Sequence, residues 1–406
     1  MKNAFVVAIL FVSYCIFDRA KAGATEFRMV VSAGEFDRRD AVVEFKSPRP
    51  GTYFRLVDAR GVEVALQTEE DRLSFIVNQL AKGGQATYRL TDKPEPAAPP
   101  RTISVSADRD GSKLKLRVGD KTVLEYQAEP GDLPRPDIKP IFKRGGYIYP
   151  IFSPSGKLVV DDFPPNHVHH HGIWTAWTKT EFEGRHPDFW NMGEGKGRVE
   201  FVNLDQHWSG PVHGGFRARH RYVDLMATPA KIAINETWKL KLYAIKGASK
   251  PLRVFDLELH HEAAGAAPLI LPKYHYGGLG FRGHRAWDGK PNCFFLTANG
   301  ESDRFKGNET KGRWCHISGN VDGARTGVAI LGHPGDFRAP QPMRLHPSEP
   351  FFCYAPSQDG DWEIAPGKPY SARYRFIVQD GEPESAELDR LWNDYANPVQ
   401  VKIESP

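Results

Sequence analysis

The apolar residues between positions 25 and 90 occur in short runs that repeat about every ten residues. Clusters of Gly, Pro, Asp and Arg separate these runs, as turns separate the strands of an antiparallel sheet. Six such runs predict a small N-terminal β-sandwich over residues 23–93. The runs cover residues 27–31, 41–45, 53–57, 62–66, 73–77 and 86–90.

A proline-rich segment follows this region and predicts a domain boundary. Four prolines fall within residues 94–100, and proline cannot donate a hydrogen bond within a sheet. We therefore predict a linker over residues 94–101 and a larger domain over residues 102–406. Alternating apolar and polar residues in that domain predict antiparallel strands with one solvated face. The expected architecture is a large antiparallel β-supersandwich-like domain.

One segment near the C-terminus has the period of a helix. Ala386, Leu388, Leu391, Trp392 and Tyr395 fall on one face at helical spacing. We predict a single C-terminal helix over residues 384–395, and the fold class is otherwise all-β.

Composition and charge exclude two classes of protein. The chain has 54 Lys and Arg against 50 Asp and Glu, a formal net charge of +4. This excess is too small for a protein that binds nucleic acid through its phosphates. Hydrophobic residues make up 40% of the chain and charged residues 26%, which argues against disorder.

The N-terminus has the parts of a secretory signal peptide over residues 1–22. Lys2 precedes an apolar run over residues 4–17 and an Ala20-Lys21-Ala22 exit, which predicts cleavage before Gly23. Such a run is too short for a membrane-spanning helix, which needs about 20 residues. The mature chain is therefore predicted to be exported, periplasmic or extracellular, with no transmembrane segment.

Signal cleavage would leave three cysteines, Cys293, Cys315 and Cys353. Three cysteines without a C-x-x-C pair indicate neither a disulfide framework nor a zinc knuckle. We expect buried structural thiols.

Histidines are concentrated in one short segment. His167, His169, His170 and His171 lie within five positions. If this segment is extended, His167, His169 and His171 share one face and His170 lies on the other. Three imidazoles on one face suit a divalent metal or general acid–base chemistry near neutral pH. The alternative is a loop whose histidines hydrogen-bond to its own backbone.

Acidic and aromatic residues near this segment complete a candidate site. We expect His169 or His170 to transfer a proton, with Asp188 or Glu194 as its acidic or orienting partner. The nearby tryptophans favour a sugar substrate, although they would serve equally well in the core. The residues expected to bind substrate are His167, His171, Trp174, Trp190, His207, His275 and Arg282.

The histidine segment also resembles a family motif. Residues 167–174 with Asp188-Phe-Trp190 resemble the "DHPHHRGLW" and "DFW" pattern of secreted bacterial proteins labelled PmoA-like, a family of undefined role. Asn166 stands where that family has Asp, and His171 stands where it has Arg. The resemblance covers about residues 140–395. It implies a galactose-mutarotase-like supersandwich. It does not imply a methane oxygenase, because the PmoA subunit of that enzyme spans the membrane several times.

These patterns predict a carbohydrate-active enzyme that hydrolyses, eliminates or epimerises a sugar, and a carbohydrate or other small polar substrate as partner. One alternative is a non-catalytic glycan-binding protein, which needs the aromatics but not the imidazoles. The other is a metal-dependent enzyme, with His167, His169 and His171 as ligands of a divalent metal. No other cofactor is expected.

Overall fold

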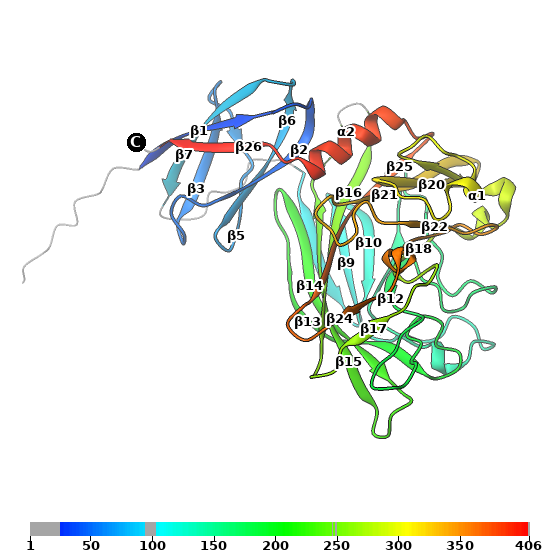
Figure 1. Cartoon of the computed structure of the whole chain (residues 1–406). Coiled ribbons are helices and arrows are strands. Elements are labelled where there is room, and N and C mark those ends of the chain that lie inside the picture. The colour runs from blue at the N-terminus through cyan, green and yellow to red at the C-terminus, as the bar shows by residue number, and fades with distance from the viewer. Residues whose placement is uncertain (1–24, 94–102, 246, 248–249, 405–406) are drawn as a thin grey trace, which may run out of the picture.

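The computed structural model describes residues 25–93, 103–245, 247 and 250–404. The predicted signal peptide and linker lie outside these residues. Figure 1 shows a small β-unit beside a larger one, with a helix at the junction.

Two antiparallel sheets form the small sandwich, as the six apolar runs predict. Met29, Val43 and Phe75 are among the buried side chains that fill its core. One sheet contains, in spatial order, β26 (Gln400–Glu404), β1 (Glu26–Ser32), β7 (Gln85–Lys93), β3 (Tyr53–Asp58) and β4 (Glu63–Val64). The other contains β2 (Arg38–Lys46), β6 (Arg72–Leu80) and β5 (Gln67–Glu69).

The last strand crosses the expected domain boundary. β26 pairs antiparallel with β1, with Lys402 opposite Val30 (Figure 1). Residues 400–404 therefore belong to the small sandwich, whereas the sequence pattern placed residues 102–406 in the large domain. The strand pairs with an edge of β1 that would otherwise present unpaired backbone groups.

Two eight-stranded antiparallel sheets form the large unit, which confirms the expected all-β sandwich. Leu116 and Phe281 of one sheet share a hydrophobic core with Phe216 and Leu257 of the other. The first large sheet contains β22 (Met343–Leu345), β23 (Phe351–Tyr354), β18 (Gly278–Arg282), β12 (Ile173–Ala176), β11 (Tyr147–Ile151), β10 (Lys121–Gln127), β9 (Lys113–Val118) and β8 (Val105–Asp110). The second contains β13 (Gly197–Trp208), β14 (His213–Asp224), β15 (Lys231–Tyr243), β16 (Leu252–Ala263), β25 (Tyr370–Asp380), β21 (Ala324–Gly332), β20 (Trp314–Val321) and β19 (Phe294–Thr297). A separate pair consists of β17 (Leu269–Leu271) and β24 (Trp362–Ile364).

The predicted C-terminal helix is α2 (Ser385–Ala396), within one residue of its expected bounds. Its buried Leu388 and Leu391 pack with Trp314 and Ile377 of the second large sheet. A further short helix, α1 (Arg304–Gly307), was not expected. None of the helices in the described part of the chain is long and apolar enough to cross a membrane.

The three described cysteines are buried, as expected, and none of them forms a disulfide. Burial raises the pKa of Cys293 and Cys353 to about 12, so these thiols stay protonated at neutral pH.

Candidate functional site

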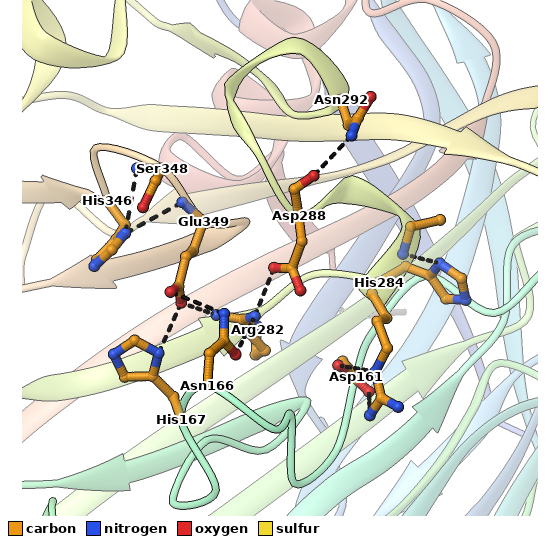
Figure 2. Close-up of polar contacts among 12 residues, drawn as sticks. Asp161, Asn166, His167, Arg282, His284, Asp288, Asn292, His346, Ser348 and Glu349 are labelled. Carbon is orange, nitrogen blue, oxygen red and sulfur yellow. Dashed lines mark hydrogen bonds and ion pairs between the residues drawn. The ribbon is translucent and has the colours of Figure 1, made fainter.

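Three neighbouring strands of the first large sheet bring distant polar residues to one end of that sheet. Ile173 at the start of β12 pairs with Phe281, and Arg282 at the end of β18 pairs with Phe351 at the start of β23. The histidine segment before β12 therefore meets Arg282 and the connection between β22 and β23. We call the resulting group the open cluster; it consists of His167, His169, Arg282, His346 and Glu349 (Figure 2 labels all but His169).

The histidine segment turns instead of extending. The backbone N–H of His167 donates to the Pro164 carbonyl (3.0 Å), and that of His170 donates to the His167 carbonyl (2.8 Å). These successive turns stack the rings of His167 and His170, with centroids 4.7 Å apart and 13° between their planes. The period-2 expectation for His167, His169 and His171 was therefore wrong, because it holds only for an extended chain.

Glu349 is the anchored carboxylate of the open cluster. The guanidinium of Arg282 has no exposed surface and forms ion pairs with Glu349 and with Asp288 Oδ1 (2.7 Å to the latter). Asn166 Nδ2 donates to Glu349 Oε1 (2.9 Å), and Asn166 Oδ1 accepts from Arg282 (3.2 Å; Figure 2). Burial raises the pKa of Glu349, but His167 and Arg282 outweigh burial and lower it to about 2. Glu349 is therefore ionised and fixed in place at neutral pH.

Two imidazoles, His167 and His346, lie against this carboxylate, and a third, His169, lies beside His167. His167 Nδ1 lies 2.9 Å from Glu349 Oε2, and the His167 side chain is 31% exposed. The His167 and His346 ring centroids are 5.8 Å apart, and those of His167 and His169 are 5.7 Å apart. Burial lowers the pKa of His346 to about 4 and that of His169 to about 3. Both rings are therefore neutral at pH 7.

The hydrogen bonds of these imidazoles leave acceptor atoms available. His346 Nδ1 accepts from the backbone N–H groups of Ser348 (3.4 Å) and Glu349 (3.2 Å), both at long distance (Figure 2). No described residue forms a hydrogen bond with the ring of His169, whereas His167 Nδ1 faces the Glu349 carboxylate at 2.9 Å. The open cluster can thus accept hydrogen bonds from a solute or bind a cation.

A buried aromatic layer lies behind the open cluster. His170 is 3% exposed, Trp174 0% and Trp190 1%. His170 stacks on Phe351 with centroids 4.8 Å apart, and burial holds its pKa well below the usual value. These positions correct three expectations: His170 cannot exchange protons with a solute, and neither tryptophan offers a face to a sugar.

The close packing of this layer explains a glycine in β18. Gly280 lies opposite Trp174 in the strand register. A Cβ atom at Gly280 would lie 2.8 Å from ring atoms of Trp174 and Trp190, closer than side chains pack. Glycine here allows the two indoles to lie over the strand.

His171 lies away from the other histidines of its segment. Its ring has no exposed surface, its Nδ1 lies 2.6 Å from Asp162 Oδ1, and it stacks on Tyr147 with centroids 4.2 Å apart. The alternative of a metal held by His167, His169 and His171 is therefore not supported. Among the described residues, a different set is grouped closely enough for a metal ion: His167, His346 and Glu349.

The two expected acidic partners lie outside the open cluster. Asp188 Oδ1 accepts from the backbone N–H groups of Trp190 and Asn191 (2.9 Å each), so it stabilises a turn. Glu194 is exposed and forms an ion pair with Lys196 (2.6 Å). Neither carboxylate is placed to orient His169.

Two further histidines are also placed elsewhere. His207 is exposed on β13, and its Nδ1 lies 3.0 Å from the carbonyl of Ala107. His275 is exposed between Tyr274 and Tyr276, with ring centroids 4.4 and 4.8 Å away. No contact joins either histidine to the open cluster among the described residues.

Sequence reasoning missed His346, Glu349 and Asp288. They follow the histidine segment by more than a hundred residues and match no motif spacing. A weaker signal was present, because His346 and Glu349 are polar residues between the short apolar runs of β22 and β23.

A second histidine group, the closed cluster of His220, Glu236 and His261, lies between the two large sheets. In the strand register, Glu236 on β15 faces His220 on β14 and His261 on β16. His220 Nδ1 lies 2.8 Å from Glu236 Oε2, and His261 Nε2 lies 2.7 Å from Oε1. Tyr126 OH lies 2.6 Å from His220 Nε2, and Trp177 Nε1 donates to His261 Nδ1 (3.2 Å).

The closed cluster is a structural feature. Its side chains are at most 1% exposed, so no solute reaches them. Burial raises the pKa of Glu236, but His261 and His220 outweigh burial and hold it well below its usual value. The buried Arg144 and Tyr222 also face this carboxylate.

Comparison with known proteins identifies a family and a distant structural likeness. The sequence pattern of a family described as "Family of unknown function (DUF6807)" matches residues 113–393. No curated protein matches the chain.

Two solved structures are similar to the chain. One is a protein in the glycosyl hydrolase family 38 from Enterococcus faecalis, with a TM-score of 0.48 and 8% identity; the match covers 94% of this chain and 47% of that one. The other is an alpha-mannosidase from Enterococcus faecalis V583, with a TM-score of 0.49 and 9% identity; the match covers 94% and 46%. This chain therefore spans about half the length of either protein.

Proposed function

This chain belongs to the DUF6807 family, whose function is unknown, and we propose that it is an exported, carbohydrate-active protein that acts at the open cluster. The observation that carries the proposal is the convergence of partly exposed His167, His169 and His346 around the anchored Glu349. Groups that accept hydrogen bonds at fixed positions suit the hydroxyl groups of a sugar.

Two groups of the open cluster have separate roles in this proposal. Glu349 Oε1 accepts one hydrogen bond from Asn166, which leaves it free to accept another from a sugar hydroxyl. His169 is partly exposed and neutral, so its ring is in the form that accepts a proton; in this proposal the bound sugar must raise its pKa from about 3 toward the working pH.

The arrangement of charges favours proton abstraction over glycoside hydrolysis. Hydrolysis commonly uses two carboxyl groups that flank the bond, one of them protonated. Glu349 is ionised and, like Asp288, forms an ion pair with Arg282. Elimination or epimerisation, in which an imidazole removes a proton from carbon, therefore fits these residues better.

A second candidate is a non-catalytic glycan-binding protein. The placement of Asp188 and Glu194 favours it, because both carboxylates expected to assist His169 lie outside the open cluster. Binding then requires Glu349 and the imidazoles only as hydrogen-bonding groups.

A panel of monosaccharides, uronic acids and oligosaccharides distinguishes these functions. We expect binding by calorimetry and a rearranged or unsaturated product by NMR. His169→Ala should lower the rate by about 10²- to 10⁴-fold, the usual contribution of a general base. His275→Ala is the matched control, because it removes an exposed imidazole elsewhere. Binding without product favours the second candidate, and the absence of both contradicts the carbohydrate proposal.

A further inference from the structure

The open cluster contains a compact set of metal-ligating groups. His167, His346 and Glu349 each offer one ligand atom, and these atoms all lie within 4.8 Å of one another. His167 comes from the turns before β12, and the other two come from the connection between β22 and β23. Two imidazoles and one carboxylate are a common protein ligand set for Zn²⁺ and for non-haem Fe²⁺.

The ligand atoms have few competing partners. His167 Nδ1 has one close partner, Glu349 Oε2 at 2.9 Å, and both atoms belong to the proposed ligand set. The two contacts that His346 Nδ1 accepts from the backbone are long, at 3.2 and 3.4 Å. A cation would therefore replace one close contact, between two of its own ligands, and two long backbone contacts.

Outer groups already fix the carboxylate. Arg282 and Asn166 contact the carboxylate of Glu349, as Figure 2 shows. Asp288 in turn forms an ion pair with Arg282. Such supporting contacts orient the ligands of metal sites and raise affinity.

The charges of the open cluster leave room for a cation. Arg282 contributes one positive charge, and Glu349 and Asp288 contribute two negative charges, so these three groups carry a net charge of −1. Imidazole ligands select first-row transition metals over Mg²⁺ and Ca²⁺, which prefer oxygen.

We propose that His167, His346 and Glu349 form a three-ligand site for a divalent transition metal such as Zn²⁺, with a remaining position open to water or solute. The inference deepens the proposed function, because the cation would lie where the sugar binds. A carbonyl or hydroxyl oxygen of the sugar would then occupy the open position.

Calorimetry with Zn²⁺ tests this site directly, with Mg²⁺ as the comparison ion. Full-length protein stripped with a chelator should bind about one Zn²⁺ per chain and should bind Mg²⁺ far more weakly. His346→Ala should weaken Zn²⁺ binding more than about 100-fold, beyond the loss caused by removing an outer contact. His207→Ala is the matched control, since it removes an exposed imidazole whose hydrogen bond is to the carbonyl of Ala107, outside the open cluster. Circular dichroism confirms that each variant is folded.

Two outcomes overturn the metal site: wild-type protein that binds no Zn²⁺, or Zn²⁺ binding that His346→Ala leaves unchanged. His167→Asn provides a second variant if His346→Ala does not fold. Repeating the sugar panel with stripped and Zn²⁺-loaded protein separates the two proposals. Zn²⁺ binding without sugar binding contradicts only the proposed function, whereas sugar binding without Zn²⁺ binding contradicts only the metal site.

Discussion

The open and closed clusters are built from the same residue types and differ in which atoms remain available. Each places a glutamate carboxylate against two histidines. In the closed cluster, Tyr126 and Trp177 take the outer ring nitrogens, and no side chain is more than 1% exposed. In the open cluster, Arg282 and Asn166 hold the carboxylate, and the imidazoles are partly exposed. The two clusters therefore differ in whether their ring nitrogens and carboxylate oxygens can contact a solute, and this difference identifies the open cluster as the candidate functional site.

The backbone beneath each cluster accounts for this difference. His220, Glu236 and His261 lie opposite one another on adjacent strands, so the sheet register fixes them and the facing sheet covers them. The open cluster is assembled from connecting segments at a sheet end, where side chains can reach solvent. The first arrangement suits stability and the second suits binding.

The largest effect is expected from removing the charge in the closed cluster. Glu236→Gln leaves buried imidazoles without their carboxylate and should lower the free energy of unfolding by about 3–5 kcal/mol. Urea denaturation measures the change. Glu349→Gln is the counterpart in the open cluster and should cost less, since Asp288 still pairs with Arg282 and water reaches His167. Equal losses would remove the distinction between the clusters.

Acid should reduce the advantage of wild-type protein over Glu236→Gln. Because the folded-state pKa of Glu236 lies below its usual 4.5, the carboxylate stabilises the fold fully above that pH. Its contribution falls as pH decreases below 4.5 and the unfolded chain takes up a proton. Urea denaturation at pH 7, 5 and 3.5 should give a narrowing difference. A difference that widens on acidification would contradict the assigned direction.

A smaller effect is expected from crowding the layer behind the open cluster. Gly280→Ala places a methyl group against Trp174 and Trp190 and should destabilise the protein by about 1–3 kcal/mol, as overpacking does. Thermal unfolding followed by tryptophan fluorescence measures both stability and the indole environment. An unchanged spectrum and melting temperature would show that this layer is loose.

The smallest effect on stability is expected at the surface of the open cluster. His346→Ala should change the free energy of unfolding by less than about 1 kcal/mol, because the ring is partly exposed and its hydrogen bonds are long. Glu194→Gln, an exposed position with a surface ion pair, is the reference for no change. A large loss in His346→Ala would mean that the open cluster, too, maintains the fold.

Periodicity predicted the elements of this protein better than its site. Helical spacing located α2 to within one residue, and apolar runs located six of the eight strands of the small sandwich, because both patterns are local. The segment at residues 167–171 was placed at the site but with the wrong local geometry. Its turns buried His170 and separated His171, and nothing in the spacing of the histidines showed this.

His346 and Glu349, the residues of the open cluster that the sequence analysis missed, could not be predicted because their proximity to His167 depends on tertiary structure. Glu349 reaches His167 only because β18 pairs with both β12 and β23, which brings segments about 180 residues apart to the same sheet end. Asp188 and Glu194 were close in sequence but satisfied local partners instead. Proximity in sequence favoured the wrong carboxylates.

The pairing of β26 with β1 has a consequence for the biogenesis of this protein. During translation, residues 26–93 of the small sandwich precede its strand β26 by about 300 residues. Until β26 follows, β1 keeps an open edge on which another nascent chain can add a strand. The small sandwich can therefore be completed only after the large unit between its strands has been synthesised.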